Sequence, residues 1–174
     1  VVFPTETAYG IAADALNEDA VEKVYEAKQR PREKKLTVIV DSLETAEEHA
    51  ELTDNERKVV EELMPGPLTL VVDKKPEVPD VLNDRFVFRI PGSELARKLA
   101  EYGPITATSA NISGKDTSYS VEDISDELLE KTDYVIDVGE LEPSATSTIA
   151  EVNNSDVVIH REGPVERGDI EEVL

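Results

Sequence analysis

The stretch STIAEVNNSDVVIHR, residues 147–161, contains two runs rich in β-branched residues with no helical pattern between them. Such runs predict strands at Ser147–Val152 and Asp156–Arg161. Two neighbouring strands joined without a helix do not fit a purely parallel sheet. This stretch therefore indicates a mixed β-sheet.

Upstream of this stretch, short apolar runs alternate with helical patterns. Strands are expected at Val1–Phe3, Leu36–Val40, Leu68–Val72, Phe86–Ile90, Ile105–Thr108 and Tyr134–Val138. Helices are expected at Asn17–Gln29, after Ser42, after Thr53, from Ser93 to about Ala100, from Ser120 onward and, as a short turn, at Asp169–Val173. Helices interleaved with strands predict an α/β fold in which helices cover the faces of the sheet.

Capping signals fix several of these helix starts. Asn17 precedes the acidic pair Glu18 and Asp19, which suits a first helical turn. Thr53 is followed three residues later by Glu56, the pattern of a capping box. Ser120 with Asp123 predicts a similar start for a helix that carries Val121, Ile124 and Leu128.

The composition points to one domain spanning residues 1–174, with an aliphatic core. Hydrophobic residues make up 39% of the chain and aromatic residues only 5%. No cysteine is present, which excludes disulfides, thiolate metal sites and a cysteine nucleophile.

The apolar runs are too short for a membrane span and no signal peptide is visible, so a cytoplasmic protein is expected. Val1 lies inside an expected strand, which suggests that an initiating segment is missing.

The formal net charge of −21 bears on partners. An acidic surface repels polyanions, so a broad nucleic-acid-binding face is disfavoured. Nucleotide-binding glycine motifs and the nucleophile elbow G-x-S-x-G are absent from the sequence. The two histidines, His49 and His160, are too few for a multi-histidine metal site.

One basic segment stands out against this acidic background: Lys28, Arg30, Arg32, Lys34 and Lys35 fall within eight residues. Cations at the end of a helix are favourable for structural reasons alone. Lys28, however, falls on the apolar face of the expected helix, where it is placed to meet a bound anion. Arg30 adds a planar fork that suits a phosphate.

Small polar residues follow the ends of other strands. They are Pro4–Gly10 (PTETAYG), Thr106–Gly114 (TATSANISG), Ser144–Thr148 (SATST) and Arg161–Gly163 (REG). Open α/β sheets bind ligands beyond the carboxyl ends of their strands. Each segment alone is equally consistent with an ordinary turn or strand edge.

Taken together, the motifs PTETAYG, KQRP, PGPLT, TSANISG, STI and REG resemble, in order and spacing, the YrdC-like threonylcarbamoyl-AMP synthase family over nearly the whole chain. The resemblance implies a twisted mixed sheet with helices on its faces around a concave pocket. It also implies that an N-terminal helix and the start of the first strand lie outside this sequence.

Position by position, the resemblance implies two sets of contacts. The threonine side is implied to comprise Thr7, Arg89, Ala107 and Ser147. The ATP side is implied to comprise Lys28, Arg30, Lys34, Ser109, Asn111, Thr117 and Arg161. Ile39 stands where longer members carry a histidine, so one threonine contact is expected to differ.

The implied activity joins L-threonine, bicarbonate and ATP into threonylcarbamoyl-AMP and pyrophosphate, for the t6A modification of tRNA. Lys28 and Arg30 are the expected catalytic residues, because cations and Mg²⁺ stabilise the phosphate charge without a protein nucleophile. The metal is expected to be held mainly by ATP and water, and its protein ligands stay open. The expected partners are the three substrates and the machinery that transfers the threonylcarbamoyl group to tRNA.

Two other functions stay open at this point. The chain also fits a carbamoyl-adenylate domain from a hydrogenase-maturation carbamoyltransferase, although the zinc-finger cysteines of those proteins are absent. An RNA-binding regulator is the third alternative, and the net charge argues against it.

Overall fold

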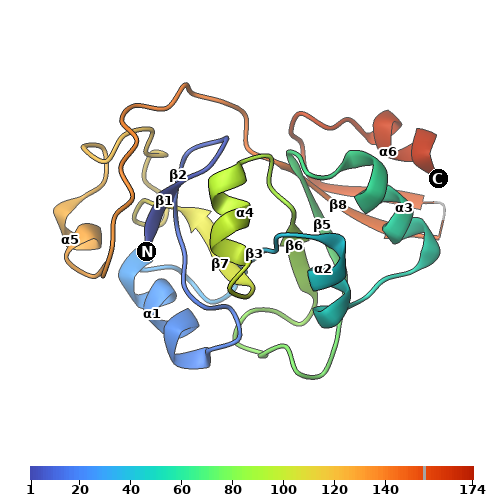
Figure 1. Ribbon diagram of the computed structural model, residues 1–174, viewed down its shortest axis with the longest axis horizontal. Helices are drawn as coiled ribbons and strands as arrows, with labels where there is room; N and C mark the ends of the chain where they lie inside the picture. Colours follow the sequence, from blue (N-terminus) through green and yellow to red (C-terminus); the bar gives the residue numbers. More distant parts are fainter. Residues whose placement is uncertain (155) are drawn as a thin grey trace.

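A computed structural model describes residues 1–154 and 156–174. Within them the chain forms one mixed sheet with helices packed against it (Figure 1). The strands are β1 (Val2–Pro4), β2 (Tyr9–Ile11), β3 (Thr37–Ile39), β4 (Ala50–Glu51), β5 (Leu68–Lys74), β6 (Phe86–Arg89), β7 (Ile105–Ser109), β8 (Thr148–Asn153) and β9 (Asp156–Arg161). The helices are α1 (Glu18–Lys28), α2 (Leu43–His49), α3 (Asp54–Leu63), α4 (Glu94–Ala100), α5 (Asp126–Leu129) and α6 (Arg167–Val173).

The strand order is β1-β2-β7-β3-β6-β5-β8-β9, and β4 pairs with β5. The pairs β3/β6 and β5/β8 are parallel, whereas the remaining pairs are antiparallel. The last two strands pair directly with each other, as their sequence predicts. The mixed sheet is confirmed.

The helix starts follow the capping signals. The side chain of Asn17 accepts a hydrogen bond from the amide of Ala20, and Thr53 and Glu56 form the predicted capping box. Each bond satisfies an amide that has no partner inside the helix. The first turns of α1 and α3 are thereby fixed by local sequence.

Two apolar clusters hold the layers together. The larger one joins the sheet to α1, α3 and α6, with Val21, Val59 and Ile170 fully buried. The smaller one lies under α4, where Phe3 and Ile39 pack against Ala96. α4 accordingly lies across β1 and β3 (Figure 1). Full burial of one such large side chain contributes about 1.5–3 kcal/mol.

The expected helix from Ser120 is wrong in its start. One oxygen of Asp123 accepts from the amides of Tyr119 and Ser120, which precede it in the chain, and this closes a turn. The helix α5 begins only at Asp126, although Leu128 is buried as expected.

The expected strand at Tyr134–Val138 is also wrong. Among residues 1–154 and 156–174, only Val2 pairs its backbone with this segment, through bonds to Tyr134 and Ile136. The next residue of β1 on the same edge is Pro4, which has no N–H to continue a ladder. The segment therefore stays irregular, and Tyr134 is 73% exposed.

Among the described residues, none of the helices has the length and apolar character needed to cross a membrane.

Candidate active site

A pocket of about 260 Å³ opens where the ends of several strands meet. The β1–β2 turn, the α1–β3 loop, β6, β7, β8 and β9 all contribute to it. Its lining comprises Thr5, Thr7, Ala8, Tyr9, Gly10, Arg30, Lys35, Thr37, Arg89, Ala107, Thr108, Ser109, Thr117, Thr146, Ser147, Ile149 and Arg161. Five sequence motifs far apart in the chain, PTETAYG, KQRP, TSANISG, STI and REG, are thus brought together.

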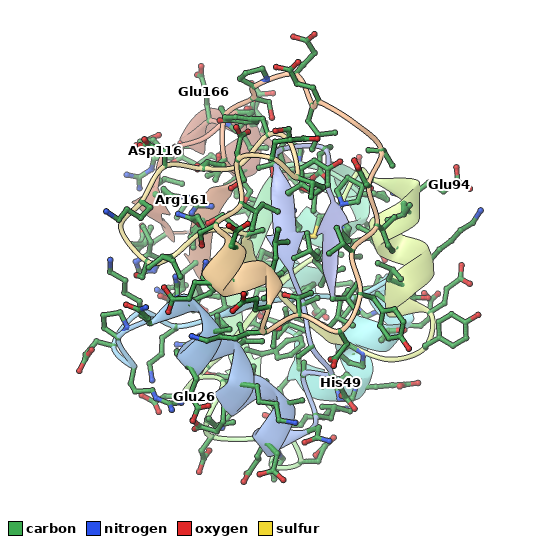
Figure 2. All side chains as sticks on the ribbon, turned by 90° about the vertical axis from the view of Figure 1, so that its left-hand side faces the viewer. Glu26, His49, Glu94, Asp116, Arg161 and Glu166 are labelled. Carbon is green, nitrogen blue, oxygen red and sulfur yellow. The ribbon has the colours of Figure 1, made fainter. Side chains whose placement is uncertain are left out.

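The charge of this lining is opposite to that of the chain. Four cations line the pocket: Arg30, Lys35, Arg89 and Arg161. In the part of the chain that the structure describes, the lining contains no aspartate or glutamate. Acidic side chains such as Glu94 and Glu166 lie at the periphery (Figure 2). An anionic ligand is therefore attracted to this pocket and repelled by the rest of the surface.

Arg89, at the end of β6, is buried and only 6% exposed. Its Nη1 lies 3.1 Å from Oε1 of Glu6. Burial lowers the pKa of Arg89, and the nearby Glu6 carboxylate opposes that shift. The guanidinium stays charged, since its pKa starts from a very high value.

Arg161, at the end of β9, is held by Ser147. Its Nε and Nη2 donate to the carbonyl oxygen of Ser147 at 2.9 and 2.7 Å, and Nη2 also donates to Ser147 Oγ at 3.0 Å. Burial lowers the pKa of Arg161, and repulsion from Arg89 lowers it further. Two arginines that repel each other across a small pocket favour a shared anion.

The segment after Arg161 passes very close to β8. A Cβ at Gly163 would lie 2.4 Å from the amide nitrogen of Thr148, so only glycine fits there. This close approach explains the glycine of the REG motif. It also brings Ser147 within reach of Arg161.

The turn between β1 and β2 is organised by Thr5. Its Oγ1 accepts from the amides of Thr7 and Ala8 at 3.1 and 3.2 Å and donates to the carbonyl of Ala8 at 2.8 Å. Thr7 Oγ1 lies 3.0 Å from Thr5 Oγ1 and lines the pocket. Thr5 is thus mainly a turn residue, and Thr7 offers its hydroxyl to a ligand.

Arg30 is half-buried and lines the pocket from the α1–β3 loop. Its Nε and Nη2 donate to the carbonyls of Lys34 and Lys35, each at 2.8 Å. These bonds fold the loop around the guanidinium. Lys35 faces the pocket as a result, whereas the predicted Lys34 is not part of the lining.

Lys28 differs most from its predicted position. The side chain points inward, but it is 1% exposed and does not line the pocket. Its Nζ donates to the carbonyl of Ser109, to the carbonyl of Asn111 at 2.7 Å and to Asn111 Oδ1 at 3.4 Å. In this structure Lys28 thus binds the backbone of the 109–111 turn, and its contact with a bound anion stays a prediction.

Asn111 is also committed within that turn. Its Nδ2 donates to the carbonyl of Lys115 at 2.6 Å, and its Oδ1 accepts from Ser109 Oγ. Asn111 is not part of the lining, whereas its neighbours Ser109, Ala107 and Thr117 are. The turn therefore offers small hydroxyl groups to the pocket.

The structure brings eight of the predicted site residues into one pocket: Thr7, Arg30, Arg89, Ala107, Ser109, Thr117, Ser147 and Arg161. Lys28, Lys34 and Asn111 lie outside the lining. Sequence reasoning missed Lys35 and Thr37 as lining residues. Lys35 belongs to the basic segment, so its charge was visible, but its direction depends on the fold of the loop.

No group of three or more His, Asp or Glu side chains within residues 1–154 and 156–174 is close enough to hold a metal ion. The pocket offers hydroxyl oxygens but, over the same residues, no carboxylate ligand. Mg²⁺ prefers carboxylates, phosphates and water. This donor set fits a metal that arrives with a phosphate ligand.

Comparison with known proteins places these features in a family. Residues 1–163 match the family of Sua5, YciO and YrdC, which is described as telomere recombination. A Methanocaldococcus jannaschii relative is 41% identical over 166 residues, which cover 95% of this chain and 80% of the relative. A threonylcarbamoyl-AMP synthase of Pyrococcus abyssi is 38% identical over 180 residues, which cover all of this chain and 53% of that protein.

A solved structure agrees with this family match. The crystal structure of P. abyssi Sua5 complexed with L-threonine superposes with a TM-score of 0.91 at 37% identity. The match covers 99% of this chain and 53% of that one. The present chain thus spans about half of the P. abyssi protein.

Proposed function

The chain belongs to the Sua5/YciO/YrdC family, and from this membership we propose that it is a threonylcarbamoyl-AMP synthase. It joins L-threonine, bicarbonate and ATP, releases pyrophosphate and thereby acts as a nucleotidyltransferase. The name of the P. abyssi relative and its threonine-bound structure support this proposal. The product is an activated threonylcarbamoyl group for the t6A modification of tRNA.

The observation that carries the proposal is the reversed charge of the pocket. Arg30, Lys35, Arg89 and Arg161 line it in a chain of net charge −21. All three substrates carry negative charge: a carboxylate, bicarbonate and a triphosphate. A pocket with several cations and many hydroxyls suits all three at once.

The proposed reaction has two bond-forming stages. The amine of threonine attacks the carbon of bicarbonate and water is lost, which gives a carbamate. A carbamate oxygen then attacks the α-phosphorus of ATP, and the bond to the leaving pyrophosphate breaks. Negative charge builds up on phosphate oxygens, so fixed cations lower the barrier without a protein nucleophile.

The threonine carboxylate is assigned to Arg89, because a planar fork binds a carboxylate with two hydrogen bonds. Thr7 and Ser147 supply hydroxyls, and Ala107 supplies backbone groups, on the same side. Arg30, Lys35 and Arg161 are assigned to the phosphates, with Ser109 and Thr117 beside them. Lys28 and Asn111 hold the turn that carries Ser109.

Mg²⁺ is proposed to enter as part of the MgATP substrate. Its ligands are then phosphate oxygens and water, which agrees with the lack of a carboxylate among the described lining residues. Bound there, the ion would neutralise charge on the triphosphate.

The proposed partner downstream is the machinery that transfers the threonylcarbamoyl group to tRNA. Direct binding of tRNA to this chain is disfavoured, because the net charge of −21 repels a polyanion.

The proposal is tested by following pyrophosphate release from MgATP while each substrate is omitted in turn. Release should require threonine and bicarbonate together. Release driven instead by carbamoyl phosphate, without threonine, would contradict the proposal and favour the hydrogenase-maturation type of carbamoyl adenylation.

A further inference from the structure

Glu6 stands in the β1–β2 turn, and its carboxylate pairs with Arg89, which lines the pocket. Glu6 itself is absent from the lining, and its side chain is 26% exposed. Its Oε1 lies 3.1 Å from Nη1 of Arg89, and its Oε2 accepts from the amide of Ser93 at 3.4 Å. The carboxylate therefore bridges the end of β6 and the segment that leads into α4.

The backbone of Glu6 is anchored from the opposite direction. Ser144, in the irregular segment before β8, donates its hydroxyl to the carbonyls of Glu6 and Thr7, at 3.1 and 3.3 Å. Glu6 is thus held at its main chain by Ser144 and at its carboxylate by Arg89 and the amide of Ser93. A side chain held at both ends has little freedom to follow Arg89 if that arginine moves.

Arg89 needs such a partner for two physical reasons. First, Arg89 is a buried cation, and a second cation, Arg161, lies close to it. Repulsion from Arg89 lowers the pKa of Arg161. Second, a guanidinium carries five N–H donors in one plane, so its orientation decides which donors face a ligand. If Glu6 fixes one edge of that plane, the direction in which the other edge meets a carboxylate is fixed too.

We infer that Glu6 is a positioning residue: its carboxylate sets the orientation of the Arg89 guanidinium for the carboxylate of the amino-acid substrate. This inference rests on the proposed function for the identity of the substrate. Glu6 does not itself touch the substrate. Its effect reaches threonine through Arg89 and leaves the phosphate side of the pocket alone.

Two substitutions of Glu6 separate its effect on the orientation of Arg89 from the effect of its charge. Glu6→Gln keeps the length of the side chain and removes its charge, whereas Glu6→Asp keeps the charge and withdraws it from Arg89. Glu94→Gln is the matched control, because Glu94 is exposed at the start of the adjacent helix and pairs with Lys98. Isothermal titration measures L-threonine and MgATP separately on each folded variant, without any turnover.

Both Glu6 variants should bind threonine about tenfold more weakly while the affinity for MgATP changes less than twofold. Glu94→Gln should bind both ligands as the parent chain does. Glu6→Asp retains the charge that compensates Arg89, so it should fold even if Glu6→Gln does not. Unchanged threonine affinity in Glu6→Asp, or an equal loss for both ligands, would overturn the inference. Threonine binding by the parent chain without formation of product would instead count against the proposed function alone.

Discussion

Arg30 and Arg32 lie two residues apart in the same loop but contact different parts of the molecule. Arg30 lines the pocket and orders the loop carbonyls. Arg32 lies over the ring of Tyr25, 4.5 Å from its centre, and pairs with Glu22 at the surface. The two side chains have the same charge, so they form a matched pair for testing the role of the pocket.

We predict that Arg30→Ala lowers turnover strongly and Arg32→Ala lowers it less than threefold. Loss of one preorganised phosphate contact costs about 2–4 kcal/mol of transition-state stabilisation, or roughly 30- to 1000-fold in rate. The measurement is kcat for pyrophosphate release at saturating substrates, with circular dichroism to check the fold. Equal effects of the two substitutions would remove Arg30 from the phosphate side.

Lys28 gives a prediction about pH. Burial, and then repulsion from Arg30, lowers the pKa of Lys28 to about 7. The unfolded chain, where a lysine has its ordinary pKa near 10.4, then binds more protons than the folded chain at any pH between these two values. Stability contributed by this residue should therefore rise with pH, starting near pH 7.

The free energy of unfolding of the parent chain minus that of Lys28→Met should increase by about 1 kcal/mol per pH unit between pH 8 and 9. Urea denaturation of both proteins at each pH measures this difference. Parallel pH curves for the two proteins would show that the carbonyls of Ser109 and Asn111 keep the ammonium charged throughout this range.

At the residue scale, the chemistry of the site was predictable and its geometry only partly so. The family resemblance implied Arg89, Arg161 and Ser147 as site residues, and the structure places all three in one pocket. The helical periodicity correctly predicted that Lys28 faces inward. Periodicity does not predict which buried acceptors the lysine contacts. Those acceptors come from a turn more than eighty positions away in the sequence.

At the scale of elements, the caps of α3 and α5 form a natural comparison. Thr53 accepts from the amide of Glu56 in a full capping box. Ser125 holds the same position before α5, but its side chain makes no capping hydrogen bond. Two hydroxyl residues at the same helix position, Thr53 and Ser125, therefore differ in whether they make capping hydrogen bonds.

We predict that Thr53→Ala lowers the free energy of unfolding by about 1 kcal/mol, whereas Ser125→Ala changes it by less than about 0.5 kcal/mol. Denaturant unfolding of the two variants and the parent chain provides the comparison. A loss of the same size at Ser125 would mean that cap hydrogen bonds do not set the stability of these helices.

The elements that the sequence predicted best have both a local signal and a buried face. α1 and α3 have caps and an apolar stripe, and β8 and β9 have β-branched runs. The segment at 134–138 has the composition of a strand, but among the described residues its only backbone bridge is to Val2. β2 and β4 were missed because strands of three and two residues are defined by their neighbours and carry almost no pattern of their own.

At the scale of the whole molecule, charge is segregated. The chain carries 39 acidic and 18 basic side chains, and four of those cations line one pocket. Mutual repulsion of the remaining surface charge opposes the compact state. Salt screens such repulsion over about 10 Å at 0.1 M.

We predict that Tm rises by several degrees when KCl increases from 0.05 to 0.5 M, since 1 kcal/mol corresponds to about 2–8 °C for domains of this size range. Differential scanning calorimetry at fixed pH measures the shift. A Tm that stays constant or falls over this range would show that surface repulsion does not limit the stability of the fold.

We propose that this pocket joins bicarbonate, threonine and ATP in one product. The direct test supplies ¹³C-labelled bicarbonate with L-threonine and MgATP and identifies the products by mass spectrometry. We predict threonylcarbamoyl-AMP carrying one ¹³C, formed by the parent chain and strongly reduced in Arg30→Ala. An adenylate without the label, or no adenylate when all three substrates are present, would contradict it.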